Sequence, residues 1–423
     1  MAKPKAELPP QGWKPTQAVA DPIINSPYDE PEKHWLYREG VPEIQDWRRP
    51  ASYYYKERRL GKREEQLFEE LEREENRDDL PLVNSLREDV RRWRDSGYRG
   101  ASSVTKELLK YWMREDRPRR LFFCQRESVE TFIYLLEFAI PGRLSATGFK
   151  NFKVDAANYQ KLLAGEKPDF ETLATSEFFP RLIDPSTEPD EIPLRRLGCK
   201  MATGSGKTIV MAMLISWAFC NRAKNPASQQ YPNAVLVCAP NLTVRNRLQV
   251  LKPEDPDNYY DEFDIVPSRY REHLNIGKVL VTNWHKFAPK SEHSEGGTSY
   301  RVVDKGEESN DAFAKDRLGD LVSRLPILVL NDEGHHCWRP KPATTEKEEK
   351  EALKELSKEQ KAIAKQDAED ARVWLAGLDK INNCGLLGKD EQEIPHPGIL
   401  TCIDLSATPF YLSNSGYPEG SPF

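Results

Sequence analysis

The sequence has little of what marks several large classes of protein. Its 423 residues include only seven cysteines, none in CxxC spacing, which excludes a disulfide-built mini-protein and argues against a structural zinc site. The longest apolar run, from Ile209 to Cys220, is about half as long as the roughly 20 residues that cross a bilayer, so we expect a core helix there. The N-terminus lacks the apolar region of a signal peptide, and we expect a cytoplasmic protein with reduced thiols.

The chain also lacks an excess of positive charge. Lysine and arginine total 62, aspartate and glutamate total 68, and the net charge is −6. This balance excludes a globally cationic surface, so any contact with nucleic acid is expected to be local, and no membrane contact is expected. The length predicts two to three domains of about 150 residues each, with at least one well-buried core.

What the chain contains instead changes along its length. Residues 1–52 are rich in proline and carry three tryptophans, which predicts an extended arm packed on another surface, without a long helix or a central strand. Residues 53–115 are rich in arginine and glutamate and predict charged helices, with Leu86, Val90 and Trp93 on one face. The main apolar core is therefore expected further along the chain.

Residues 116–412 alternate between short apolar runs and helical or polar segments. Five runs rich in Val, Ile and Leu have the character of buried parallel strands: 197–201, 234–239, 278–283, 327–332 and 399–407. The pattern predicts an α/β domain with a mainly parallel sheet and helices on both faces. Between the strands we expect four insertions, at 150–195, 251–275, 288–320 and 339–398. In the last, the charged run from Glu346 to Asp370 predicts an exposed helix or a short coiled-coil arm, and residues 413–423 are expected to be a truncated linker.

The segment Met201-Ala-Thr-Gly-Ser-Gly-Lys-Thr208 follows one of these strands and opens a helix. This is the context of a phosphate-binding loop, in which glycines let backbone N–H groups approach an anion, although Met201 stands where the full motif has glycine. Lys207 is expected to reach the β- and γ-phosphates of a nucleotide, and Thr208 to bind Mg²⁺. The residues expected to contact the nucleotide here are Thr203, Gly204, Ser205, Gly206, Lys207 and Thr208.

Another apolar strand ends in Asp332 and Glu333. In phosphate-loop enzymes an acidic residue at the end of a neighbouring strand binds Mg²⁺, and a second carboxylate can orient the attacking water. We expect Asp332 to bind the metal and Glu333 to orient the water. The following residues, His335-His336-Cys337, are not expected to bind zinc, because adjacent residues on one turn rarely form a tetrahedral set.

Together these motifs resemble those of superfamily 2 helicases and translocases of the Asp-Glu-x-His type. Three motifs occur in the order of that family: Met201–Thr208 as motif I, Asp332-Glu333-Gly334-His335 as motif II and Ser406-Ala407-Thr408 as motif III. Two further segments are similar to the family's glutamine motif and motif Ia, namely Phe123-Cys124-Gln125-Arg126-Glu127 and Ala239-Pro240-Asn241-Leu242. The finer resemblance is to the motor (Res) subunit of type III restriction endonucleases.

The resemblance implies a RecA-like P-loop ATPase lobe that uses ATP and Mg²⁺. Gln125 would contact adenine, and Lys207, Asp332, Glu333 and His335 would be catalytic. Motif III consists of Ser406, Ala407 and Thr408. His335 would couple the nucleotide to this motif, which would transmit hydrolysis to movement of the nucleic-acid strand. Contacts with a nucleic-acid backbone are implied for Pro240, Asn241, Thr243, Arg245, Asn283, Trp284 and His285.

The family's motor also has a second RecA-like lobe, which supplies an arginine to the transferring phosphate. Only 13 residues follow Phe410, so we expect the chain to be the N-terminal part of a motor, truncated before that lobe and before any nuclease. Two functions stay open. The chain is either the ATP-hydrolysing lobe of a DNA translocase or helicase in a restriction or phage-defence system, with low activity expected for the isolated chain, or a module that binds ATP and nucleic acid and hydrolyses slowly. In both cases a second lobe, a methyltransferase or a nuclease subunit is the expected protein partner.

Overall fold

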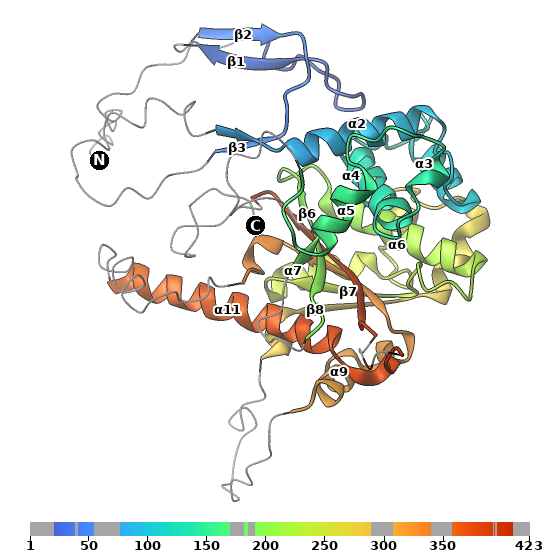
Figure 1. Ribbon diagram of the computed structural model, residues 1–423, viewed down its shortest axis with the longest axis vertical. Helices are drawn as coiled ribbons and strands as arrows, with labels where there is room; N and C mark the ends of the chain where they lie inside the picture. Colours follow the sequence, from blue (N-terminus) through green and yellow to red (C-terminus); the bar gives the residue numbers. More distant parts are fainter. Residues whose placement is uncertain are drawn as a thin grey trace, which may run out of the picture.

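The computed structural model describes residues 21–38, 41–54, 77–169, 182–184, 191–288, 308–339, 358–391, 393 and 396–408. Its centre is a six-stranded sheet in the order β5-β6-β10-β9-β7-β8 (Figure 1). The strands are β5 (Ile183–Asp184), β6 (Leu194–Lys200), β7 (Ala234–Ala239), β8 (Lys278–Asn283), β9 (Ile327–Asp332) and β10 (Ile399–Ser406). All neighbours are parallel except the short β5, which pairs antiparallel with β6. The predicted α/β fold with a mainly parallel sheet is confirmed, and each of the five predicted strands lies where its apolar run lies.

The strand order brings the motif-bearing strand ends to one edge of the sheet. Because β6 to β10 are parallel, their carboxyl ends share that edge, where ligands of open α/β sheets bind. One expectation is corrected here. The strand that ends in Asp332 does not adjoin the strand that precedes the phosphate loop, because β10 lies between β6 and β9. The last strand among the described residues, β10, therefore lies between the strands that carry the loop and the acidic end.

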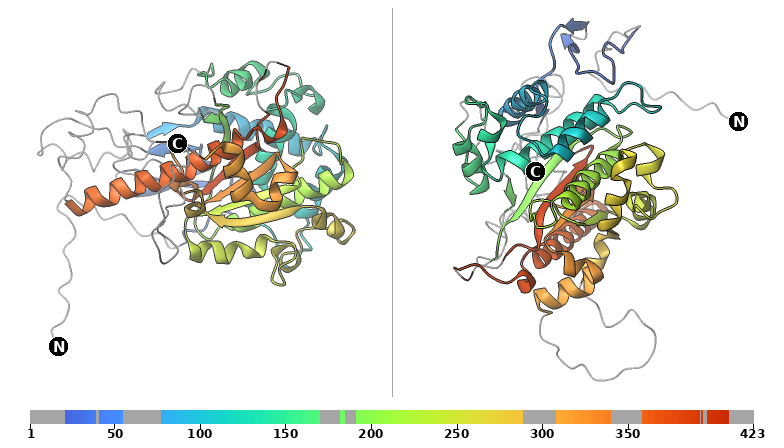
Figure 2. Two further views of the ribbon diagram at one scale, coloured as in Figure 1. Left: turned by 90° about the horizontal axis from the view of Figure 1, so that it is seen from below. Right: turned by 90° about the vertical axis from the view of Figure 1, so that its right-hand side faces the viewer.

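Helices cover both faces of the sheet (Figure 2). The pleat sorts the side chains, since Val235, Val237 and Ala239 of β7 join one core, and Ala234, Leu236 and Cys238 join the other. The first face is covered by α2 (Pro81–Asp95), α3 (Ser103–Trp112), α4 (Phe123–Tyr134), α5 (Ala156–Leu163), α6 (Lys207–Lys224), α7 (Leu242–Arg247) and α8 (Tyr259–Glu262). Helix α6 is buried all round from Val210 to Asn221, as its uniform apolarity predicts.

The second face is covered by α9 (Asn310–Leu318) and α11 (Lys358–Asn382). These helices lie in segments that we expected to be insertions, and their described parts belong to the core: Phe313 is buried under α9, and Trp374 and Leu378 are buried under α11. The other two expected insertions also contribute core residues, Tyr159 and Tyr260 among them. The charged composition of these segments did not indicate their place in the core, because a helix needs only one apolar face to pack on a sheet.

The N-terminal part forms two small antiparallel ribbons (Figure 1). Strand β1 (His34–Arg38) pairs with β2 (Val41–Gln45), and β3 (Ser52–Tyr54) pairs with β4 (Arg77–Asp79). The region expected to be helical thus begins with strand pairing, and the helices among its described residues are α2 and α3. Residues 1–20, 55–76 and the expected linker at 413–423 lie outside the described residues.

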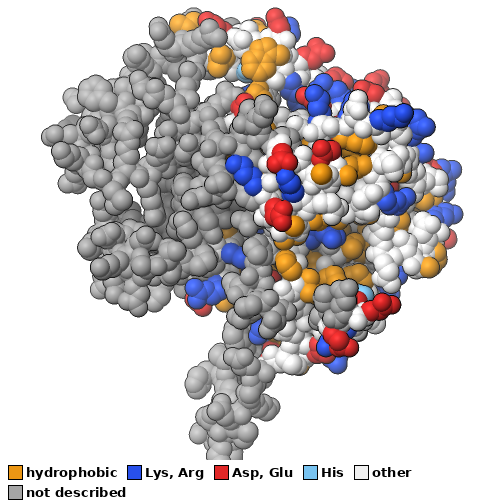
Figure 3. All heavy atoms as spheres, viewed as in Figure 1, with side chains coloured by type: hydrophobic (Ala, Val, Ile, Leu, Met, Phe, Trp, Pro, Cys, Tyr) orange, Lys and Arg blue, Asp and Glu red, His pale blue; other side chains and the backbone are white. Residues whose placement is uncertain are grey.

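The cysteine thiols of this chain are unpaired and mostly buried, and charges of both signs lie on its described surface. On the face shown in Figure 3, acidic and basic side chains are interspersed and do not separate by sign. All seven cysteines are free, and only Cys124 is exposed. Within the part of the chain that the structure describes, no helix combines the length and apolarity that crossing a bilayer requires.

Candidate functional site

The loop between β6 and α6 has the backbone of a phosphate-binding loop. Gly204 and Gly206 have φ angles of +80° and +88°, which glycine adopts without steric cost, and Gly206 is the residue that precedes the first turn of α6. Thr203 and Gly204 are exposed, whereas Lys207 and Thr208, at the start of the helix, are half-buried. The first N–H groups of α6 have no partner within the helix, so they and the helix dipole favour an anion at this position.

The acidic strand end meets the loop lysine. Lys207 Nζ lies 2.7 Å from Glu333 Oε1, across 126 residues of sequence. Glu333 has a φ of +50°, a left-handed conformation that costs a non-glycine residue about 1 kcal/mol or more. Such strain clusters at functional sites, and the carboxylate of Glu333 contacts the loop lysine.

Asp332 is suited to bind a cation. Burial, followed by the negative charge of Glu333, raises the pKa of Asp332, so its ionised form is disfavoured unless a positive charge lies nearby. Carboxylate and hydroxyl oxygens are the ligands that Mg²⁺ prefers. Asp332 and Thr208 therefore fit the predicted metal site, and their role as metal ligands stays a prediction.

His335 connects the acidic strand end to β10. Its Nδ1 lies 2.9 Å from Ser406 Oγ and 3.5 Å from Glu333 Oε2. Ser406 is fully buried, and its Oγ accepts a hydrogen bond from Thr408 N at 3.0 Å. Burial, and then the charge of His336, lowers the pKa of His335 to about 4, which leaves the ring neutral at pH 7. The structure thus forms one contact chain, Lys207–Glu333–His335–Ser406, and Ala407 lies beside its end.

Gln125 lies against the phosphate loop. It is 2% exposed, its Oε1 accepts a hydrogen bond from Phe122 N at 2.9 Å, and its Nε2 donates to Ser205 O at 2.9 Å. A Cβ atom at Gly206 would lie only 2.1 Å from Gln125 Nε2, so this close approach requires glycine. The predicted contact of Gln125 with adenine is untested. What the structure places beside it is the backbone of the loop.

The two segments predicted to contact nucleic acid lie side by side at the same sheet edge. Pro240 and Asn241 follow β7, and Trp284 follows β8. The Nε1 of Trp284 donates a hydrogen bond to Pro240 O at 2.9 Å. Asn241 Oδ1 accepts from Val244 N at 2.9 Å and caps α7, which carries Thr243 and Arg245.

The side chains at the end of β8 differ in exposure. Asn283 is buried and its Nδ2 lies 3.1 Å from His285 Nδ1, whereas His285 is exposed and stacks on Trp284 with ring centroids 3.8 Å apart. All seven predicted residues are thus gathered on two adjacent strand ends. Their contact with nucleic acid stays a prediction.

The sequence reasoning missed a buried charge cluster beneath this edge. Arg196 Nε donates to Asp404 Oδ2 at 2.8 Å, and Asn331 Nδ2 donates to Asp404 Oδ1 at 2.7 Å. Asp404 is packed under the turn of motif II, because a Cβ atom at Gly334 would lie 2.6 Å from Asp404 Cβ. A charged residue inside an apolar strand was the available signal, since burying a lone carboxylate is too costly without partners.

A second part of this cluster joins the sheet to α11. Arg196 Nη1 donates to Asp184 Oδ2 at 2.8 Å, and Arg339 Nε donates to Asp184 Oδ1 at 2.8 Å. Arg339 also forms a bidentate pair with Asp379 at 2.7 and 2.9 Å. The segment after motif II is thereby held to the second-face helix.

Comparison with known proteins agrees with this geometry. Residues 191–364 match the family described as "Type III restriction enzyme, res subunit". The match includes the phosphate loop, the acidic strand end and both predicted nucleic-acid segments, whereas Gln125 and Ser406–Thr408 lie outside it. No curated protein and no solved structure matches the chain. The resemblance seen in the motifs is confirmed: residues 191–364 belong to a superfamily 2 helicase-type domain with a RecA-like P-loop fold, and β10, which follows the matched range, completes its sheet.

Proposed function

We propose that this chain carries the ATP-hydrolysing lobe of a DNA-dependent translocase or helicase that serves a restriction or phage-defence system. The helicase-like, ATP-binding character of the domain follows from its family. The observation that supports hydrolysis is the contact chain from Lys207 through Glu333 and His335 to Ser406, because it joins the phosphate loop to the strand that bears motif III.

The geometry supports a division of labour among these residues. The N–H groups of the loop and Lys207 would bind the β- and γ-phosphates of ATP. Thr208 and Asp332 would hold Mg²⁺, which when bound neutralises charge on those phosphates. Glu333 would accept a proton from the attacking water and orient it.

Motif III would respond to that step through His335. A change at Glu333 alters its 3.5 Å contact with His335, and His335 in turn contacts Ser406 at 2.9 Å. Movement of Ser406 would reach the exposed strand ends at Asn241 and His285 through the shared sheet edge. Asn241, His285 and their neighbours would contact the backbone of the nucleic acid and position it without reading its sequence.

The direct test is ATP hydrolysis by the purified chain, alone and with single-stranded or duplex DNA. We expect ATP binding and DNA-stimulated turnover, both lost in Lys207→Ala because the phosphates lose their cation. An unchanged ATP affinity in Lys207→Ala would refute the phosphate-loop assignment.

Binding without turnover would favour the second function, a module completed by a partner. The resemblance implies that such a partner is a second RecA-like lobe with its arginine, worth about 10³ to 10⁵ in rate in related phosphoryl-transfer systems. Adding that lobe, or a methyltransferase or nuclease subunit, would then restore hydrolysis.

A further inference from the structure

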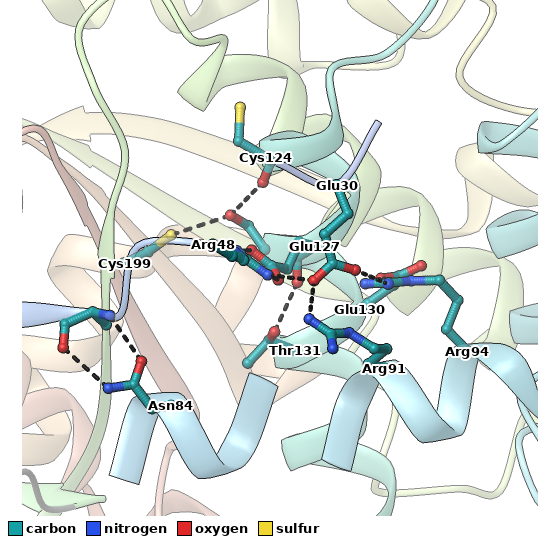
Figure 4. A network of polar contacts seen from close by, with 12 residues as sticks. Glu30, Arg48, Asn84, Arg91, Arg94, Cys124, Glu127, Glu130, Thr131 and Cys199 are labelled. Atoms are coloured by element: carbon teal, nitrogen blue, oxygen red, sulfur yellow. Dashed lines mark hydrogen bonds and ion pairs between the residues drawn. The ribbon is translucent and has the colours of Figure 1, made fainter. Parts of the chain in front are cut away.

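The N-terminal arm, defined here as residues 21–54 without 39–40, is bound to α4 by a shielded ion network (Figure 4). Arg48 donates from Nη1 and Nη2 to the two carboxylate oxygens of Glu127, both at 2.7 Å. The side chains of Arg48 and Glu127 are only 18% and 14% exposed. A bidentate pair of this kind is more directional than a single-contact ion pair on the surface, and solvent screens it less.

The network extends from the arm to α2. Arg48 Nη1 also donates to Glu30 Oε1 at 2.8 Å, and Glu30 pairs in turn with Arg91 and Arg94 of α2. Arg94 Nη2 donates to Glu130 Oε2 of α4 at 2.6 Å. The arm therefore supplies one cation and one carboxylate to a network that joins three separate segments of the chain.

The arm also contacts the first turn of α4 directly. The N–H of Phe123, the first residue of α4, donates to Pro27 O at 2.8 Å. This N–H has no partner within the helix, so the arm accepts a hydrogen bond from one of the unpaired backbone donors at the start of α4. The rings of Tyr28 and Phe122 lie 5.8 Å apart, and the Arg48 guanidinium lies 5.5 Å from the centre of the Phe123 ring. The arm thus contacts the start of α4 through a backbone hydrogen bond, an aromatic contact and the Arg48 guanidinium.

The start of α4 is also the part that touches the phosphate loop. Gln125 stands two residues before Glu127 and donates to Ser205 O, and its amide fills the space above Gly206. Ser128, the next residue after Glu127, has its Oγ 3.7 Å from Cys199 Sγ of β6. The start of α4 therefore contacts the phosphate loop through Gln125 and the strand that precedes the loop through Ser128.

We propose that the N-terminal arm is a positioning element of the nucleotide site, in which the Arg48–Glu127 pair holds the first turn of α4, and through Gln125 the phosphate loop, in the conformation that binds ATP. This inference rests on the proposed function. Arg48 acts through α4, so it is a positioning residue. It lies outside the helicase-type domain of residues 191–364, which would make the ATP affinity of that domain depend on a segment before it.

The test measures the dissociation constant of a fluorescent ATP analogue for the full chain and its variants. Arg48→Ala and Glu127→Ala are each expected to raise the constant about tenfold, because either change frees the turn that supports Gln125. The double variant is expected to bind no more weakly than the single ones, because both remove the same interaction. Arg48→Lys keeps the charge and loses the fork, so an intermediate effect is expected.

The matched control is Lys33→Ala, which removes an exposed ion pair of the same arm, Lys33 Nζ to Asp46 Oδ1 at 3.4 Å, and should leave ATP affinity unchanged. Where turnover is measurable, KM for ATP should rise while kcat at saturating ATP falls by less than about twofold, a split that general destabilisation does not produce. Unchanged affinity in Arg48→Ala, or effects of the two single variants that add fully, would overturn the inference. If Arg48→Ala does not fold, Arg48→Lys and Glu127→Gln provide the same comparison. Failure of the unaltered chain to bind the analogue would instead overturn the proposed function.

Discussion

Glu333 holds the Lys207 ammonium group at 2.7 Å, with the two side chains only 30% and 11% exposed. A phosphate that contacts Lys207 competes with this carboxylate for the charge of the ammonium group. A hydrogen bond to a charged group contributes about 1.5 to 3 kcal/mol. Because Glu333 keeps some contact with solvent, the lower end of that range applies, and about 1.4 kcal/mol corresponds to a tenfold change in affinity. Glu333→Gln removes the charge and preserves the shape, so we expect ATP to bind about tenfold more tightly.

Hydrolysis should change in the opposite direction. Loss of a general base lowers a rate by about 10² to 10⁴, so DNA-stimulated turnover should vanish from Glu333→Gln while binding improves. The assays are equilibrium titration with a fluorescent ATP analogue and phosphate release. Glu393→Gln is the matched control, since Glu393 also has a positive φ, +63°, and pairs with Lys389 at 3.2 Å, but is exposed. Weaker binding, or normal turnover, in Glu333→Gln would refute the assigned role of Glu333.

Three further outcomes follow from the electrostatics of the site. Asp332→Asn removes a half-buried charge whose pKa is raised by burial and by Glu333. A thermal melt should show a midpoint about 1–2 °C higher for each 1 kcal/mol gained in a chain of this size, and Mg²⁺-dependent ATP binding should be lost. The pKa of His335 is about 4 in the folded chain, below its ordinary value of 6.5. As the pH is lowered, the unfolded chain therefore takes up the proton first, and the free energy of unfolding decreases. Urea unfolding should show that His335 lowers the free energy of unfolding by about 2 kcal/mol between pH 7 and pH 5. Arg339→Ala removes the cation that pairs with Asp379, which is only 4% exposed. The free energy of unfolding should therefore decrease by about 3 kcal/mol.

Each of these outcomes has a clear contrary result. A lower melting midpoint in Asp332→Asn would mean that its charge is already compensated within the folded chain. An equal pH dependence in His335→Asn would remove His335 from the acid response. A loss below about 1 kcal/mol in Arg339→Ala would mean that water reaches the Asp379 carboxylate.

Local sequence patterns were sufficient for the elements of the sheet and for the loop. The five parallel strands were predicted because each is a short run of β-branched and other apolar residues, buried on both faces. The phosphate loop was predicted because its chemistry resides in consecutive residues, with glycines at the two positions that adopt positive φ. Motif order then indicated the family, and residues 191–364 match it.

Other features depended on contacts between distant segments. Residues 339–398 were expected to be an insertion outside the sheet core, yet Trp374 and Leu378 of α11 pack on the sheet. A helix's few apolar residues become core only when a sheet face lies opposite them, and no local pattern reports that face.

The sequence by itself determined the strands, the loop and the identity of the motif residues, because these follow from periodicity and from chemistry carried by neighbours in the chain. Tertiary structure alone decided that β10 lies between β6 and β9, that Lys207 meets Glu333 across 126 residues, and that Arg48 of the arm anchors α4 beside the loop. Such pairings depend on strand order and on the burial of each charge, which many distant residues set together. The sequence shows which charged residues exist, and the fold decides which of them are buried deeply enough for their pairing to affect stability or binding.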